Sequence, residues 1–489
     1  MDVNKDGFED IYLTGRKKAD RLYLNRGDGT FKDIYPESGM TITSNFVTQG
    51  IAGADVNKDG WIDLFITTNT TMDSTQQIPR AKNLFFLNNG NNTFTEATEE
   101  YGLNNVNSFS TGVSFGDFNA DGYPDAYIAN YFHEYEGPLN EISDATIVNA
   151  NNTAHGYLLL NIKGKKFKNV YTDYGLKHKG FGFSGLFTDY DNDGDQDLLI
   201  NNDFGYKATP NYLLQNNYPK KNFTYVEKEK EMDIRINAMT SAVGDYDNNG
   251  WLDYFITNIR FNYFMVNQGD TLPFVDKSKE LGTKLFKIGW GANFSDFDHD
   301  GDLDLFVSNG DLNPYCTPMN NFYYENENYQ FKEIGSQVGL NDYGIGRGSV
   351  IFDLENDGDM DLLVVNQTPV LSYPVPSKTL LYRNDTPTQN WLKVALQGTQ
   401  STTNGLGSRI KIVAGDQQLI REVDGGGSSH LSQNSTISHF GLGAQTTIDS
   451  LIVTWIGGEQ QLLTNLSANQ LLTIQQVPRE KQPLSLIHI

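Results

Sequence analysis

The chain has 489 residues, with 37 Lys and Arg against 61 Asp and Glu, and therefore a formal net charge of −24. Binding to DNA or RNA depends mostly on Lys and Arg that neutralise phosphates, so this charge argues against a nucleic-acid partner. No stretch of the sequence approaches the 18 apolar residues expected of a membrane-spanning helix. With 12% aromatic residues and 47 glycines, the composition favours β-structure with many turns.

A nine-residue phrase recurs seven times along the chain. The second copy reads DVNKDGWID and the fourth reads DYDNDGDQD. The seven copies start at Asp2, Asp55, Asp117, Asp189, Asp245, Asp296 and Asp353. Recurrence at this spacing indicates a repeated structural unit.

Each copy is followed by short runs that have the pattern of β-strands. In the second repeat these are DLFITTN from Asp63, LFFLN from Leu84 and FTEA from Phe94, and another apolar run precedes the next copy. The unit is therefore a four-stranded meander, and the sequence predicts an all-β fold with a seven-bladed β-propeller over residues 1–385. A β-helix has shorter repeats, and separate β-sandwiches would need linkers that this spacing does not allow. The first blade is expected to be incomplete, because Met1 begins inside the first phrase whereas every other copy follows an apolar run.

The phrase D-x-[DN]-x-[DN]-G-x-x-D places oxygen-bearing side chains at positions 1, 3, 5 and 9 around a glycine turn. Hard oxygen ligands in this arrangement suit Ca²⁺, and up to seven ions are predicted. An EF-hand is less suitable, because its closing Glu stands at position 12 and its loop joins two helices. The predicted ligands are Asp2, Asn4, Asp6 and Asp10; Asp55, Asn57, Asp59 and Asp63; Asp117, Asn119, Asp121 and Asp125; Asp189, Asp191, Asp193 and Asp197; Asp245, Asp247, Asn249 and Asp253; Asp296, Asp298, Asp300 and Asp304; Asp353, Glu355, Asp357 and Asp361.

Single segments of this composition are often ordinary turns, but seven matching copies favour metal binding. The sites are not expected to be equal. Asn249 replaces an acid in the fifth loop and Glu355 occupies position 3 of the seventh, while the first loop should bind more weakly because Asp2 lies at a chain end. Extracellular calcium modules bind at about 10⁻⁴ to 10⁻³ M, so such sites would stay empty in the cytosol. The sequence therefore predicts an extracellular or cell-surface protein.

At these residues the repeats resemble the FG-GAP/VCBS family, whose members are similar to the calcium-bearing blades of integrin α-subunit propellers. Beyond them, NWLKVALQGTQSTTNGLGSRIKIVAG from Asn390, HLSQNSTISHFGLG from His430 and IDSLIVTWIGGE from Ile448 resemble the ASPIC/UnbV domain. The combination is similar to bacterial relatives of the cartilage acidic protein family. This resemblance implies a secreted calcium-binding protein, with the loop residues given above as ligands. Ile456-Gly457-Gly458 departs from the Pro-Ser-Gly that usually follows the Trp in such domains.

Read without the resemblance, residues 390–477 form a separate small β domain with strands around Val394, at Ile410–Val413 and at Leu451–Trp455. His430 and His439 are predicted to be turn and surface residues, because no acid or Cys stands at ligand spacing from both. Residues 478–489 are predicted to be a tail, in which LSLIHI at 484–489 does not resemble native protein sequence. A signal peptide and an anchoring segment would then have been lost from the ends.

Two functions remain open from the sequence. The first is an extracellular binding or adhesion scaffold, in which calcium holds the blades and long loops contact a protein or glycan, with the chain acting as a monomer. The second is a polysaccharide-active enzyme such as a lyase, for which Arg80, His133, Tyr135, His155 and Tyr315 are weak candidates without catalytic spacing.

In an antiparallel meander the calcium loops lie at one end of the blades and the second connections at the other. Long second connections with aromatic residues are common recognition sites. We therefore expect a partner to dock on the metal-free face, chiefly through Tyr131, Phe132, Tyr135 and Tyr315.

Overall fold

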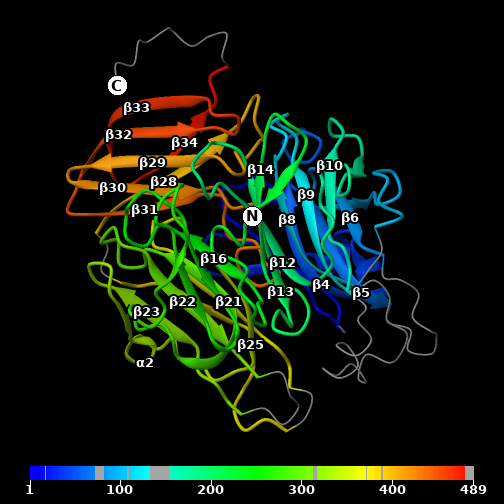
Figure 1. The fold of residues 1–489 in the computed structure, drawn as a ribbon, viewed down its shortest axis with the longest axis horizontal. Helices are drawn as coiled ribbons and strands as arrows, with labels where there is room; N and C mark the ends of the chain where they lie inside the picture. The colour runs from blue at the N-terminus through cyan, green and yellow to red at the C-terminus, as the bar shows by residue number, and fades with distance from the viewer. Residues whose placement is uncertain are drawn as a thin grey trace.

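The computed structural model describes residues 1–16, 18–71, 82–106, 109–132, 153–311, 317–369, 372–386 and 389–478. Seven antiparallel sheets follow one another along the chain and a β domain follows them (Figure 1). In the described part of the chain, no helix has the length and apolar character needed to cross a membrane.

The first three sheets come from the N-terminal third of the chain. The first contains β1 (Ile11–Leu13), β2 (Arg21–Asn25) and β3 (Phe31–Asp33). The second contains β4 (Phe46–Ala54), β5 (Asp63–Thr71), β6 (Leu84–Asn88) and β7 (Phe94–Glu96). The third contains β8 (Phe109–Gly116), β9 (Asp125–Phe132), β10 (Tyr157–Asn161) and β11 (Phe167–Asn169).

Sheets four to seven repeat the pattern. The fourth contains β12 (Phe181–Thr188), β13 (Asp197–Asp203), β14 (Tyr212–Asn216) and β15 (Phe223–Tyr225). The fifth contains β16 (Ser241–Gly244), β17 (Asp253–Ile256), β19 (Tyr263–Val266) and β20 (Val275–Asp276). The sixth contains β21 (Phe286–Ser295), β22 (Asp304–Asn309), β23 (Phe322–Asn326) and β24 (Phe331–Glu333), with β18 (Ile259–Phe261) paired to β21. The seventh contains β25 (Gly346–Phe352), β26 (Asp361–Asn366) and β27 (Leu380–Tyr382).

The predicted four-stranded meander is confirmed in sheets two to six, whereas the first and seventh sheets have three strands each. Short helical turns η1 (Tyr35–Glu37), η2 (Thr41–Asn45) and α2 (Gly335–Val338) lie in connections between sheets. Buried apolar clusters lie between neighbouring sheets. One joins Leu199 and Leu213 of the fourth sheet to Tyr254 and Ile256 of the fifth, and another joins Ile11 of the first sheet to Phe352 of the seventh. The seven sheets therefore pack as a closed ring.

Hydrogen bonds from one asparagine of each repeat connect every sheet to the preceding one. The side chain of Asn216, at the end of β14, donates to the carbonyl of Phe118 in the preceding repeat at 2.8 Å. Asn25 closes the ring by donating to the carbonyl of Leu354 in the seventh repeat, also at 2.8 Å. The other donors and acceptors are Asn88 and Val3, Asn161 and Val56, Asn267 and Tyr190, Asn326 and Tyr246, and Asn384 and Phe297. We call these seven residues the asparagine ring.

The C-terminal domain is built from two sheets. One has the order β31 (Ser438–Gly443), β28 (Asn390–Gln397), β34 (Gln470–Gln475), and the other has the order β30 (Gln417–Glu422), β29 (Arg409–Ala414), β32 (Thr447–Thr454), β33 (Gln460–Ser467). Its apolar residues, among them Leu392, Ile410 and Trp455, belong to the same buried cluster as Phe115 of β8. The domain and the ring therefore share a core.

Replacing a member of the asparagine ring should destabilise the fold. Asn216→Ala removes the donor for the buried carbonyls of Phe118 and Gln196, and should lower the free energy of unfolding by about 1–3 kcal/mol. Asn222→Ala, an exposed position in the following turn, should change it by less than about 0.5 kcal/mol. Denaturant titration of both variants measures the difference, and equal effects would show that the ring does not hold neighbouring sheets together.

Candidate functional site

Each nine-residue phrase forms the same hydrogen-bonded loop. In all seven loops the backbone N–H of the sixth-position glycine donates to the first-position Asp, at distances from 2.8 to 3.2 Å. The glycine φ angles lie between +83° and +102°, a region that residues with a Cβ seldom adopt. The phrase thus folds into a loop that turns its acidic side chains towards one another.

The ninth-position Asp ties each loop to the asparagine ring. Its Oδ1 accepts the backbone N–H of the ring asparagine of the same repeat, as in Asp197 with Asn216 at 2.7 Å and Asp253 with Asn267 at 2.8 Å. Its Oδ2 accepts the N–H of the second loop residue in six repeats, as in Asp197 with Tyr190 at 3.2 Å. The ninth Asp is therefore buried in the frame of each blade, and its orientation depends on the neighbouring blade.

Three loops bring carboxylates close enough to share a cation. The sets are Asp189, Asp191 and Asp197; Asp245, Asp247 and Asp253; Asp296, Asp298 and Asp300, each with ligand oxygens within 4.8 Å of one another. These loops belong to sheets four, five and six. Position 3 is an acid in all three, so three carboxylates of one loop repel one another unless protons or a cation neutralise them.

Several of these oxygens have no partner although they are buried. Asp191 Oδ1, Asp247 Oδ1, Asp296 Oδ1 and Glu355 Oε2 make no hydrogen bond within the described residues. A buried carboxylate oxygen without a donor costs free energy, which a bound cation offsets. The donor set contains only oxygen, so the loops fit a hard divalent cation.

The pKa values of the loop carboxyl groups show the same crowding. Burial, followed by the charges of Asp193 and Asp189, raises the pKa of Asp191 to about 6. Burial raises the pKa of Asp245 to about 7 against the lowering effect of the Gly250 N–H. The pKa of Asp300 rises to about 6 by burial, despite the hydrogen bond from the Asp302 N–H, which lowers it.

The first three loops are built differently. Position 3 is Asn, whose side-chain amide donates to the fifth-position Asp, as in Asn57 to Asp59 at 2.9 Å. The amide occupies one carboxylate oxygen that would otherwise face a cation. The fifth-position Asp is exposed in all three of these loops, and the first-position Asp2 is half-buried whereas Asp55 and Asp117 are buried.

Sequence reasoning missed an acidic residue at position 7 of three loops. The predicted ligand set covers positions 1, 3, 5 and 9 and leaves out Asp195, Asp302 and Asp359, of which Asp195 and Asp359 are buried. Burial and the charges of Asp193 and Asp191 raise the pKa of Asp195 to about 8. The acid that recurs after the glycine in DNDGDQD, DHDGDLD and ENDGDMD could have revealed these residues from the sequence. These loops carry one more negative charge than the ligand pattern counts.

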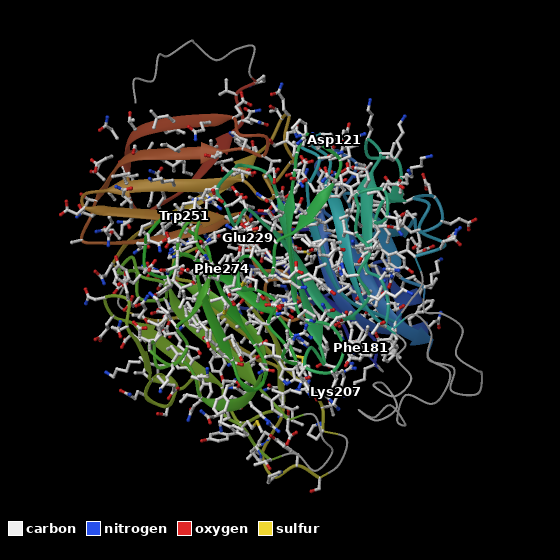
Figure 2. The ribbon with its side chains drawn as sticks, viewed as in Figure 1. Asp121, Phe181, Lys207, Glu229, Trp251 and Phe274 are labelled. Atoms are coloured by element: carbon white, nitrogen blue, oxygen red, sulfur yellow. The ribbon has the colours of Figure 1, made fainter. Side chains whose placement is uncertain are left out.

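The C-terminal domain covers the loop end of the ring. Lys393 Nζ lies 2.6 Å from Asp353 Oδ2, Thr403 Oγ1 donates to Asp55 at 2.7 Å, and Arg409 Nη2 lies 3.7 Å from Asp189 Oδ2. Figure 2 labels Asp121 of the third loop near the C-terminal domain, and Lys207 at the opposite end of the ring. A cation of the C-terminal domain therefore sits beside the first-position Asp of two loops.

A segment of the same domain passes along the inside of the ring. Residues 424–435, which we call the plug, contact innermost strands from β4 to β25. The Gly425 carbonyl accepts the Phe115 N–H, the Leu431 carbonyl accepts the Ile51 N–H, and Ser435 N–H donates to Ile351. The plug enters from the loop end, and its tip reaches Phe183 and Trp290 near the other end, where His430 packs on both rings.

Two predictions about single residues are wrong. His430 and His439 are not surface residues, because they are 6% and 7% exposed, packed between the ring and the C-terminal domain. Tyr131 and Phe132 cannot anchor a partner, because they are 9% and 2% exposed in an aromatic cluster with Phe181.

Tyr135 and Tyr315 lie outside the described residues, as do the enzyme candidates Arg80 and His133. His155, the remaining enzyme candidate, is engaged in the fold. Its Nδ1 lies 2.7 Å from the His178 carbonyl, and its ring packs on Tyr171. Nothing in these contacts points to a reacting group.

Comparison with known proteins identifies both parts of the chain. The FG-GAP-like repeat model matches residues 2–66, 55–128, 189–256, 245–307 and 296–364, and the ASPIC and UnbV model matches residues 398–481. Cartilage acidic protein 1 from Xenopus tropicalis is 24% identical over 428 residues, which cover 84% of this chain and 61% of that protein. The human protein of the same name is 22% identical, with 89% and 64% covered. The chain thus spans less than two thirds of these relatives.

Two solved structures show a more distant likeness. A lectin from Agrocybe aegerita that recognises non-reducing terminal N-acetylglucosamine matches with a TM-score of 0.42 and 15% identity, over 78% of this chain and 91% of that one. The V. cholerae biofilm matrix protein Bap1 matches with a TM-score of 0.34 and 11% identity, over 87% and 61%.

The metal-free chain should lose stability as the pH rises. The pKa values of Asp245 and Asp361 are about 7 in the fold, above the ordinary value of 3.8 for an unfolded Asp. The folded state therefore binds more protons between about pH 4 and pH 7, and the free energy of unfolding falls across that window. Denaturant titration in chelator at pH 5.0 and pH 7.5 should show lower stability at pH 7.5. A stability that rises over this range would contradict the protonated loops.

Proposed function

This chain belongs to the FG-GAP-like repeat family, and from the geometry of its loops we propose that it is a calcium-binding propeller that acts outside the cell as a binding scaffold for a protein or a glycan. The observation that carries the proposal is the set of buried, unpartnered carboxylate oxygens in the repeated loops. Oxygen-only ligands in flexible loops suit Ca²⁺ better than Mg²⁺, which demands a tighter octahedral shell. Extracellular calcium, at about 10⁻³ M, would fill sites of the affinity usual for such modules.

In this proposal calcium acts as a structural brace rather than as a reactive group. The ninth-position Asp links each loop to the asparagine ring, so an ion in the loop fixes the position of two neighbouring blades. Bound ions would also neutralise the repulsion among carboxylates that the pKa values record. When bound, the ion supplies charge neutralisation and a coordination shell that holds the loop in one conformation.

The C-terminal domain supports placing the partner on the other face. It covers the loop end of the ring and contacts three first-position Asp residues, so that end is occupied by the chain itself. The opposite face carries exposed aromatic side chains: Tyr206, Phe261 and Phe286 are 51%, 40% and 62% exposed. Phe261 and Phe286 pack edge to face with ring centroids 5.4 Å apart. These residues take the place that Tyr131 and Phe132 were predicted to fill.

A binding role is proposed in preference to catalysis because histidines of the described chain are buried in the fold. His178 and His439 are buried, and burial lowers the pKa of His178 to about 3. A neutral, enclosed imidazole does not serve as a general acid near neutral pH.

Calcium content tests the loop assignment directly. Asp191→Asn removes a charge from the three-carboxylate set of the fourth loop and should reduce the bound calcium by about one ion per chain after dialysis in about 1 mM Ca²⁺, a concentration suited to such modules. Asp173→Asn, at an exposed position on the edge of the third sheet, should leave it unchanged. Metal analysis of the dialysed proteins gives the count. No calcium in the unmodified chain would refute the proposal.

Binding to extracellular material tests the scaffold role. The protein should bind at least one member of an array of glycans and matrix proteins in millimolar Ca²⁺, and binding should fall when chelator removes the brace. The Asp191→Asn variant should bind more weakly than the Asp173→Asn variant. If the protein retains calcium but binds no member of the array, the scaffold function is wrong although the loops bind metal.

A further inference from the structure

A group of cationic and aromatic side chains surrounds the tip of the plug, at the end of the ring opposite the acidic loops. We call it the channel mouth and define it by Arg16, Phe183, Trp290, Arg347 and His430. Arg16 lies in the β1–β2 connection, Phe183, Trp290 and Arg347 lie near the starts of innermost strands, and His430 is the tip of the plug. Figure 2 labels Phe181, at the start of β12, towards this end of the ring.

Arg347 is held in place on one wall. Its guanidinium lies over the Trp290 ring, 4.1 Å from the ring centroid. Nη2 donates to the Asp311 carbonyl at 3.0 Å and Nη1 donates to the Gly346 carbonyl at 2.7 Å. The Trp290 ring is fixed in turn, because its Nε1 donates to the Gly310 carbonyl at 2.6 Å. The Arg347 guanidinium therefore has a fixed orientation without a bound ligand.

Arg16 contributes a second guanidinium. Its backbone adopts φ +53° and its N–H donates to Thr48 Oγ1 at 3.2 Å, which fixes the start of the side chain. Within the described residues the guanidinium makes no hydrogen bond or ion pair of its own. The nearby Asp20 is 1% exposed and already accepts from Tyr12, Gly15 and Thr48.

Arg16 carries its charge on the surface of the protein. The side chain is exposed, yet desolvation by the surrounding protein lowers its pKa. Both Arg16 and Arg347 lie near enough to His430 to lower the pKa of its imidazole, which burial lowers first. His430 is therefore neutral, and its buried Nδ1 has no partner among the described residues. Two positive charges thus lie near the tip of the plug in a chain whose net charge is −24.

An aromatic row runs from the mouth to the rim. Phe183 contacts Tyr131, Tyr131 contacts Phe181, and Phe181 contacts Phe204, with ring centroids 5.8, 5.6 and 5.6 Å apart. The row ends at Tyr206, whose ring centroid lies 6.4 Å from that of Phe204 and which is 51% exposed. Lys207 Nζ lies 5.3 Å from the Tyr206 ring centroid. A second cationic and aromatic contact therefore lies outward from the first.

We propose that the channel mouth binds an acidic glycan, whose carboxylate or sulfate group pairs with Arg16 and Arg347 and whose further residues extend over Tyr206 and Lys207. The proposal rests on the scaffold function and names the partner class and the place. Guanidinium groups bind carboxylate and sulfate oxygens through paired hydrogen bonds, and aromatic faces cover the apolar faces of sugar rings. The acidic loops at the other end of the ring would repel the same ligand.

Calorimetry in millimolar Ca²⁺ with defined oligosaccharides tests the proposal. Oligogalacturonate and a chondroitin sulfate oligosaccharide present carboxylate alone and carboxylate with sulfate, and methyl-esterified oligogalacturonate is the neutral match. At least one acidic oligosaccharide should bind and the neutral one should bind at least about tenfold more weakly, as loss of a charged hydrogen bond predicts. Equal binding of the acidic and neutral forms would overturn the proposal.

Variants locate the site. Arg16→Gln should weaken binding of the acidic oligosaccharide about tenfold or more, while Arg26→Gln, an exposed position of the same sheet, should not change it. Calcium content measured on the same samples reports whether the fold and its metals are intact. If Arg16→Gln and Arg26→Gln bind alike, the channel mouth is not the site, although the scaffold function stands. If an acidic peptide of Asp and Glu binds in preference to both oligosaccharides, the glycan assignment is wrong.

Discussion

The hydrogen bonds of the ninth-position Asp hold together the rest of this structure. One carboxylate oxygen accepts the N–H of the ring asparagine, and that asparagine's side chain donates to the loop of the preceding blade, as Asp197, Asn216 and Phe118 show. Loop conformation, blade position and ring closure are therefore coupled through one pair of side chains per repeat. Closure at Asn25 and Leu354 means that no blade of the described ring lacks this link to its predecessor.

This coupling explains why the same residues suit a cation. A carboxylate that is buried to hold two backbone amides is costly to ionise, and the loop places further carboxylates beside it. Asp253 is fully enclosed, and burial followed by the charge of Asp247 raises its pKa well above the ordinary value. A divalent ion can neutralise several such groups without breaking the amide contacts. The side chains that could hold a cation are therefore also the ones that fix the packing of the blades.

The loops and their order in the fold could be predicted from the sequence, because the spacing of Asp, Asn and Gly states the turn and the oxygen donors directly. The asparagine ring could also have been found, since an Asn closes each LYLN-like run, but its partner lies in another repeat and local pattern does not reveal it. The plug could not be predicted from the sequence. Its glycines and serines read as turns, and only the ring explains why Gly425 and Gly427 sit against the backbone of Phe115 and Gly185.

The wrong predictions of exposed side chains share one cause. Tyr131, Phe132 and His430 were assigned to exposed positions by their place in turns or long connections, and packing between elements distant in the sequence buries them. Exposure depends on what covers a residue, and here the cover comes from another blade or from the C-terminal domain. The position-7 acids were missed for a different reason: the predicted ligand pattern includes only positions 1, 3, 5 and 9, although the charges of Asp193 and Asp191 act on the Asp195 side chain.

Acidic and basic side chains gather at opposite ends of the ring. The loop end gathers acids and draws Lys393 and Arg409 of the C-terminal domain into contact with them. The tip of the plug, His430, lies near Arg16 and Arg347 at the other end, where Asp20 already accepts hydrogen bonds from Tyr12, Gly15 and Thr48. One segment of the C-terminal domain thus touches both ends. The plug therefore joins the acidic end of the ring to the cationic end through one packed element.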